Sequence, residues 1–245
     1  MERTLVLHCT TITAPQRTEQ RRPTASGSVL LYCATLADLL PRLRDLSAML
    51  DKHEQDRAER FLHDTDRERY LLGHGYLREV LGWATGQQPG AITFERGQFG
   101  KPTMRGTALH FNFSDTKDAV IVAIGREELG VDIETMHRRV DHMAVAEHYF
   151  TAEEIANINA SSEPKRRFLD FWTRKEAILK ASGVGIMDDL PALRVDSRRN
   201  EVRIVHGDFV RMAAPEYHVQ SFTLGEGHLV SIATPEHASL ALATH

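Results

Sequence analysis

The sequence predicts an α+β fold of two similar lobes related by a pseudo-twofold axis, each with helices packed on a mainly antiparallel sheet. Both halves of the 245-residue chain run from strand or loop through helices to a group of strands. These strands follow one another closely, as antiparallel pairing allows. The length allows a core in each half. We expect an N-terminal extension over residues 1–27, an N-terminal lobe over 28–129 and a C-terminal lobe over 130–245.

The first 27 residues show no clear secondary-structure pattern, and regular patterns begin after them. Proline, threonine and arginine dominate the first 27 residues, which favours loop with a short strand at 5–7. The run VLLYC over 29–33 predicts a buried strand, and residues 37–60 are expected to be helical. Thr65-x-x-Glu68 matches a capping box and opens a longer helix. Strand-like runs follow at 92–94, 109–113, 119–124 and 129–134.

The run at 129–134 places two carboxylates on one face of a strand. Side chains alternate along a strand, so Asp132 and Glu134 point away from Val131 and Ile133. Together with 109–113 and 119–124, this run is expected to form an antiparallel meander. The second half should begin with helices and end in strands. Helices are expected over 141–149, from a second capping box at Thr151-x-x-Glu154, and over 168–183, with strands near 193–196, 201–205, 216–224 and 228–234.

The helix over 168–183 carries an apolar stripe with an acidic border. Ser162 suits its N-cap, Pro164 its first turn and Gly183 a left-handed end. Apolar residues recur at three- and four-residue steps, namely Phe168, Phe171, Trp172, Ile178 and Leu179. Glu176 lies one turn after Trp172 and one turn before Lys180. It is either a partly desolvated functional carboxylate or half of an ordinary surface pair.

Composition argues against several classes of function. A net charge of −4 gives no global attraction to nucleic acid or to anionic membranes. Two cysteines form no disulfide framework and lack metal-ligand spacing, which favours a reducing compartment. No apolar run approaches the ~20 residues that span a bilayer, and the N-terminus lacks a signal-peptide pattern. We therefore expect a cytoplasmic monomer with no nucleic-acid or membrane partner.

Two acidic motifs together predict a cation site. Asp132 and Glu134 repel each other on one strand face, and a hard divalent cation such as Mg²⁺ relieves that repulsion. Alone, the pair also fits a solvated strand edge. Glu176 on a helix about forty residues later supplies a third carboxylate. Lysines beside it suit phosphate charge.

These motifs resemble the Sfp-type 4'-phosphopantetheinyl transferase family from about residue 29 to the C-terminus. The order and spacing are family-like, and the residues that carry the resemblance are Gly130-Val131-Asp132-Ile133-Glu134, Trp172-Thr173-Arg174-Lys175-Glu176-Ala177, Lys180-Ala181, Gly100-Lys101-Pro102, Phe111-Asn112-Phe113-Ser114 and Arg60-Phe61, with the helix bearing Arg69, Gly73, Leu77 and Arg78.

The resemblance implies an activity. The family moves the 4'-phosphopantetheine arm of coenzyme A to a serine of an apo acyl or peptidyl carrier protein and releases adenosine 3',5'-bisphosphate. It also implies a site. Asp132, Glu134 and Glu176 would bind Mg²⁺, or Mn²⁺ in its place. The catalytic residues would be Glu176, Lys180 and Asp132, and those contacting coenzyme A would be Arg60, Lys101, Pro102, Ser114, Lys175 and Lys180.

Some assignments keep alternatives. Arg60 fits either the 3'-phosphate of coenzyme A or a salt bridge in a charged helix. Glu176 fits a ligand, a base or both. The carrier should dock near the seam between the lobes, over 136–156. Asp115 stands where the family usually has histidine, so it points away, passes its role to Arg60 or Lys101, or weakens 3'-phosphate recognition.

Two other functions compete with the transferase. One is a non-catalytic protein that binds coenzyme A or carrier proteins, which Asp115 alone suggests. The other is a metal-dependent phosphoesterase, because carboxylates around Mg²⁺ also serve hydrolysis.

Overall fold

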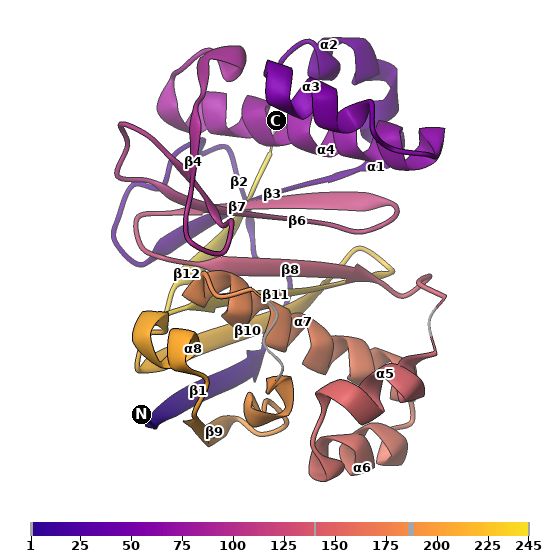
Figure 1. Cartoon of the computed structure of the whole chain (residues 1–245), viewed down its shortest axis with the longest axis vertical. Coiled ribbons are helices and arrows are strands. Elements are labelled where there is room, and N and C mark those ends of the chain that lie inside the picture. The colour runs from indigo at the N-terminus through magenta and orange to yellow at the C-terminus, as the bar shows by residue number, and fades with distance from the viewer. Residues whose placement is uncertain (1, 140, 186–188, 245) are drawn as a thin grey trace.

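A computed structural model describes residues 2–139, 141–185 and 189–244. Two five-stranded sheets face each other, and helices cover their outer faces (Figure 1). The first sheet has the strand order β2-β12-β3-β7-β6, and the second has β8-β11-β10-β1-β9. The α+β class is therefore confirmed. Residues 1, 140, 186–188 and 245 of the expected extension and lobes lie outside the described residues. No helix in the described part is long and apolar enough to cross a membrane.

The first sheet and its helices come mainly from the first half. Their elements are β2 (Arg17–Thr18), β3 (Ser28–Thr35), α1 (Leu36–Leu39), α2 (Leu43–Ser47), α3 (Lys52–Ala58), α4 (Asp64–Thr85), β6 (His110–Asp115) and β7 (Ala119–Gly125), with the small hairpin β4 (Phe94–Arg96) and β5 (Pro102–Met104). Single 3-10 turns cover Leu40–Arg42, Pro89–Ala91 and Leu190–Ala192.

The second sheet and its helices come mainly from the second half. Their elements are β1 (Arg3–Thr11), β8 (Gly130–Thr135), α5 (His142–Tyr149), α6 (Ala152–Ala160), α7 (Pro164–Ser182), β9 (Arg199–Ile204), α8 (Gly207–Met212), β10 (Glu216–Leu224) and β11 (His228–Thr234), while β12 (Ser239–Ala243) returns to the first sheet. Strand β1 runs parallel to β10, and β12 runs parallel to both β3 and β2. The other described pairs are antiparallel, as expected.

The expected extension over residues 1–27 is wrong for its first part. Strand β1 lies inside the second sheet, paired with β10 on one side and β9 on the other. Leu5, Leu7 and Cys9 alternate into the core of the second lobe. The burial of these apolar side chains and the two-sided backbone pairing stabilise the strand. Because β12 also crosses to the first sheet, each lobe includes a strand from the opposite end of the chain.

The strand with the two carboxylates does not complete a meander. Strands β6 and β7 form the expected antiparallel hairpin, but β8 pairs with β11 in the other sheet. Val131 and Ile133 pack between the two sheets. The alternation therefore turns Asp132 and Glu134 toward α7, on the opposite face.

Helix ends follow local chemistry only in part. The capping box at Thr151 and Glu154 is formed, and Gly183 ends α7 in the left-handed conformation with φ 72°. The box expected at Thr65 is absent because α4 already begins at Asp64. Glu163, not Ser162, precedes α7, and it makes no side-chain cap. Residues 193–196, expected as a strand, have no regular structure.

Candidate active site

A glycine lets helix α7 lie directly against strand β8. A Cβ atom at Gly130 would lie 2.1 Å from the carbonyl oxygen of Ala177 and 2.3 Å from the backbone nitrogen of Ala181. Any side chain there would push the helix away from the strand. This close approach brings the polar face of α7 over Asp132, which shares the face of Gly130.

Asp132 belongs to a three-residue hydrogen-bond network. Ser114 Oγ on β6 donates to Asp132 Oδ1 at 2.8 Å. Lys180 Nζ on α7 donates to the same oxygen at 2.6 Å and to Ser114 Oγ at 2.8 Å. Three predicted site residues from different elements therefore meet. The second oxygen of this carboxylate, Oδ2, is buried and has no hydrogen-bond partner among the described residues.

Glu176 and Glu134 are both difficult to ionise in this environment. Burial and the nearby Asp132 raise the pKa of Glu176 to about 7. The same two causes raise the pKa of Glu134 to about 7, although Arg138 pairs with it and opposes the shift. Glu176 Oε1 is buried, and no described group hydrogen bonds to it. The raised pKa values indicate that the positive charges nearby do not offset burial and the repulsion from Asp132.

This donor set fits a hard divalent cation. Three carboxylates, two of them with an unpartnered buried oxygen, are the oxygen donors that Mg²⁺ or Mn²⁺ prefers. Their oxygens do not yet form a compact group, since the one described trio of potential ligands within 4.8 Å lies elsewhere. Lys180 and Arg138 occupy one oxygen each of Asp132 and Glu134.

A cavity of about 290 Å³ opens beside Glu176 and Lys180. It lies where the lobes meet and is lined by Phe99, Gly100, Lys101, Pro102, Asn112, Phe113, Glu176, Leu179, Lys180, Gly183, Val184 and Gly185. Lys101 joins the lobes, because its Nζ donates to Glu128 Oε2 at 2.6 Å and to the carbonyl of Ala181 at 3.2 Å. Residues predicted from separate motifs thus line one cavity.

The chain also matches known proteins over both lobes. A family model described as the 4'-phosphopantetheinyl transferase superfamily matches residues 128–233, and one described as the N-terminal part of 4'-phosphopantetheinyl transferase matches 40–127. The 4'-phosphopantetheinyl transferase HetI of Nostoc sp. is 32% identical over 168 residues, covering 66% of this chain and 71% of that protein. The chain belongs to the 4'-phosphopantetheinyl transferase superfamily.

Further relatives carry the same family name. A 4'-phosphopantetheinyl transferase of Bacillus subtilis is 26% identical over 180 residues, covering 72% of this chain and 76% of that protein. The 4'-phosphopantetheinyl transferase Sfp of the same species is 24% identical over 192 residues, covering 76% and 82%. The resemblance to the Sfp-type transferases is therefore confirmed. The two family models meet between residues 127 and 128, close to the expected lobe boundary.

One predicted coenzyme A contact of this family member is wrong. Lys175 is fully buried, and its Nζ donates to Glu154 Oε2 at 2.9 Å and to the carbonyls of Tyr149 and Leu190 at 2.9 and 3.3 Å. All three ammonium protons have acceptors within the core, so Lys175 ties α7 to α6. It cannot reach a phosphate without breaking these bonds.

Arg60 lies apart from the cavity beside Glu176. It is exposed and, with His53, Arg57 and Phe61, lines a separate hollow of about 480 Å³. The guanidinium of Arg57 lies over the Tyr70 ring, 5.4 Å from its centroid. The assignment of Arg60 to coenzyme A therefore stays a prediction.

Two residues at the site were missed by sequence reasoning. Asn112 lines the cavity, and its Oδ1 accepts a hydrogen bond from the Val131 backbone at 2.9 Å, which links the two sheets. Its spacing of two from Ser114 placed it on the same strand face, so this role was readable. Arg138, which pairs with Glu134, was expected only as part of the carrier-docking segment 136–156. Nothing local indicated that it would turn back toward β8.

Without divalent cations, the free energy of unfolding should fall as pH rises from about 4.5 to 7. Glu134 and Glu176 have folded pKa values of about 7 against an ordinary value of 4.5. The folded state therefore holds more protons than the unfolded state in this window, and stability is lost as they leave. Urea unfolding in EDTA at about pH 5.5 and 7.5 measures this. Mg²⁺ should stabilise the chain more at the higher pH. Equal stabilisation at both would contradict the account.

Proposed function

We propose that the chain transfers the 4'-phosphopantetheine group of coenzyme A to a serine of an apo acyl or peptidyl carrier protein and releases adenosine 3',5'-bisphosphate. The observation that carries this proposal is the unpartnered, buried Oε1 of Glu176 beside a cavity also lined by Lys101 and Lys180. A carboxylate without a partner suits a hydroxyl nucleophile, and two lysine ammonium groups around the same cavity suit a diphosphate substrate. We further propose that the protein acts as a cytoplasmic monomer.

The side chains of the site have separate tasks in this reaction. The carrier serine oxygen forms a new bond to the phosphorus that bears the pantetheine arm, and the bond from that phosphorus to the bridging oxygen breaks. The departing bisphosphate keeps this bond's electron pair. Glu176, with a pKa of about 7, suits the acceptance of the serine proton. Lys180 would stabilise the phosphate charge from its position beside Asp132.

Asp132, Glu134 and Glu176 would hold Mg²⁺ or Mn²⁺, which when bound supplies positive charge to the diphosphate. Glu176 cannot accept a proton while fully engaged as a ligand, so ligand and base are alternative roles for it. Ser114 orients Asp132 by hydrogen bonding to one of its oxygens. Asn112 maintains the junction between β6 and β8 on which this alignment depends.

The test is the intact mass of the carrier. The purified chain is incubated with Mg²⁺, coenzyme A and a panel of apo carriers from fatty acid, polyketide and nonribosomal peptide systems. One carrier or more should gain a single phosphopantetheine mass, and replacement of its acceptor serine by alanine should abolish the gain. No gain on any carrier of the panel would count against the proposal.

Asp115→His should increase the preference for coenzyme A over dephospho-coenzyme A by about ten- to a hundredfold, because a charge-assisted hydrogen bond is worth about 1.5–3 kcal/mol. Asp115 lies beside Ser114, and its Oδ2 is 3.3 Å from Nε of Arg69. Burial raises the pKa of Asp115, and its ionised form would repel a nearby phosphate. The readout is the ratio of kcat/KM for the two donors.

The matched control is Asp66→Asn, because Asp66 also pairs with Arg69, at 3.5 Å. It should leave the donor preference unchanged. Equal preference in the wild type and in Asp115→His would show that Asp115 does not face the 3'-phosphate.

A further inference from the structure

Two histidines and a glutamate meet on the face of the second sheet that lies opposite α7. His8 on β1 is the direct register partner of His218 on β10, and Glu216 lies two residues before His218. Leu7 and Cys9 point into the core beneath α7. The alternation of side chains therefore places His8 on the other face, together with Glu216 and His218. In the sequence, His8 and Glu216 are 208 residues apart.

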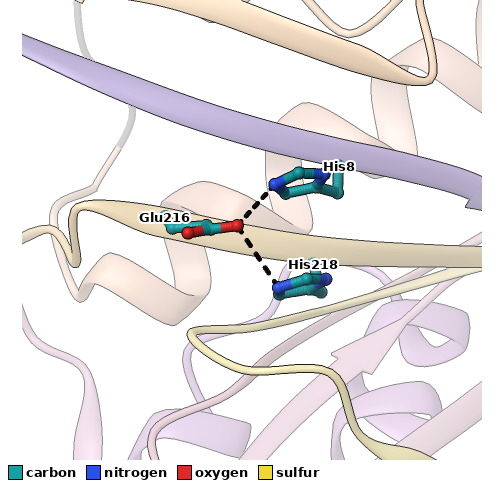
Figure 2. A group of neighbouring side chains, drawn as sticks. All are labelled: His8, Glu216 and His218. Atoms are coloured by element: carbon teal, nitrogen blue, oxygen red, sulfur yellow. Dashed lines mark ion pairs between the residues drawn. The ribbon is translucent and has the colours of Figure 1, made fainter.

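The ring nitrogens of both histidines converge on one carboxylate oxygen (Figure 2). His8 Nε2 contacts Glu216 Oε1, and His218 Nε2 lies 3.6 Å from the same atom. The two rings stack with centroids 4.7 Å apart and planes 10° apart. One ligand atom from each residue lies within 4.8 Å of the others, which no other His, Cys, Asp or Glu trio achieves in the described part of the chain. The residues are thus arranged before any ligand binds.

The chemistry of this trio suits a borderline metal ion rather than Mg²⁺. Two imidazole nitrogens and one carboxylate oxygen are a common donor set for Zn²⁺, whereas Mg²⁺ prefers oxygen alone. His8 Nε2 is shielded from solvent and makes no hydrogen bond of acceptable geometry with any described group.

We propose that His8, Glu216 and His218 bind a first-row divalent transition metal of the Zn²⁺ class and thereby fasten β1 to β10. The fourth position would be filled by water or by His237, whose ring centroid lies 5.9 Å from that of His218. None of the three ligands lines the cavity beside Glu176, so this metal is separate from the proposed transfer chemistry. Its effect is to restrain the N-terminal strand within a sheet whose other strands all follow residue 129.

The test uses the tag-free full chain, stripped with EDTA and desalted, with Co²⁺ as a spectroscopic probe. Equilibrium dialysis should show one site that gives a visible Co²⁺ absorption band, and Zn²⁺ should displace the band. His8→Ala and His218→Ala should each weaken Co²⁺ binding more than about 100-fold, since loss of even an outer-shell partner costs 10–100-fold. Asp132→Asn should keep the site, which separates it from the carboxylates at the cavity.

Two controls make the result decisive. His63→Ala removes an exposed histidine elsewhere and should leave Co²⁺ binding unchanged. Zn²⁺ should slow amide hydrogen exchange in β1 of the wild type but not in His8→Ala, whose circular dichroism spectrum reports that it is folded. Absence of the Co²⁺ band in the wild type, or an unchanged band in folded His8→Ala, would overturn the proposal.

Discussion

Glu176→Gln should lower kcat for carrier modification by about 10³-fold, within the 10²–10⁴ range of a general base. The amide keeps the shape of the side chain but neither accepts the serine proton nor carries charge for a cation. Glu176 is a half-buried residue whose buried Oε1 has no partner among the described residues and whose pKa is raised to about 7. The rate of mass gain on the carrier, at saturating coenzyme A and Mg²⁺, measures the effect.

The same variant separates the two roles of Glu176. If it is mainly a ligand, high Mg²⁺ should restore part of the activity. If it is mainly a base, Mg²⁺ should have no effect and the acidic limb of the kcat–pH profile should disappear. Glu163→Gln removes an exposed carboxylate just before α7 and should retain full activity. Full activity in Glu176→Gln would remove this residue from the proposed reaction.

Lys175→Met should lower the free energy of unfolding by about 3–5 kcal/mol, the usual cost of breaking a buried ion pair by removing one partner. Neither Lys175 nor Glu154 has any exposed side-chain surface. The variant leaves the Glu154 charge without its cation in the core of the second lobe. Urea unfolding measures the loss. The KM for coenzyme A should stay unchanged, because the ammonium points away from the cavity.

The matched variant is the double change Lys175→Met and Glu154→Gln. It removes the uncompensated charge and should recover part of the stability. The glutamine side chain keeps one carbonyl oxygen, which can accept a hydrogen bond from the backbone N–H of Thr151 or of Val195, the two backbone groups that donate to the carboxylate of Glu154. A raised KM for coenzyme A with unchanged stability in Lys175→Met would instead restore the role predicted from the family resemblance.

Lys175 and Lys180 on α7 show which part of the site could be predicted from the sequence. Phe171, Lys175 and Ile178 are separated by four and three residues, so Lys175 lies within the buried stripe. Its burial could have been derived from spacing alone, but the family motif favoured a phosphate contact. Glu176 and Lys180 are one turn apart on the other side, and the structure brings Lys180 to Asp132. Helical spacing was thus sufficient for both residues.

The sequence predicts the fold correctly where segments that are adjacent in the chain also pair in space. Strands β10 and β11 have the predicted bounds because they form a local hairpin with clear alternation. Strand β1 was missed as part of a lobe because its parallel partner β10 lies about two hundred residues later. The direct contact of α7 with β8 depends on the missing side chain of Gly130. No local pattern indicates which helix a strand glycine will face.

Transfer is tested by measuring modified carrier and released adenosine 3',5'-bisphosphate in the same reaction, with Mg²⁺ and with EDTA. We expect equal amounts of the two products, formed with Mg²⁺ and only when the carrier is present. Bisphosphate released at the same rate without carrier would identify a phosphoesterase. Coenzyme A binding with neither product, across the whole panel of carriers, would identify a non-catalytic binding protein. Either result would contradict a transfer site at Asp132, Glu176 and Lys180.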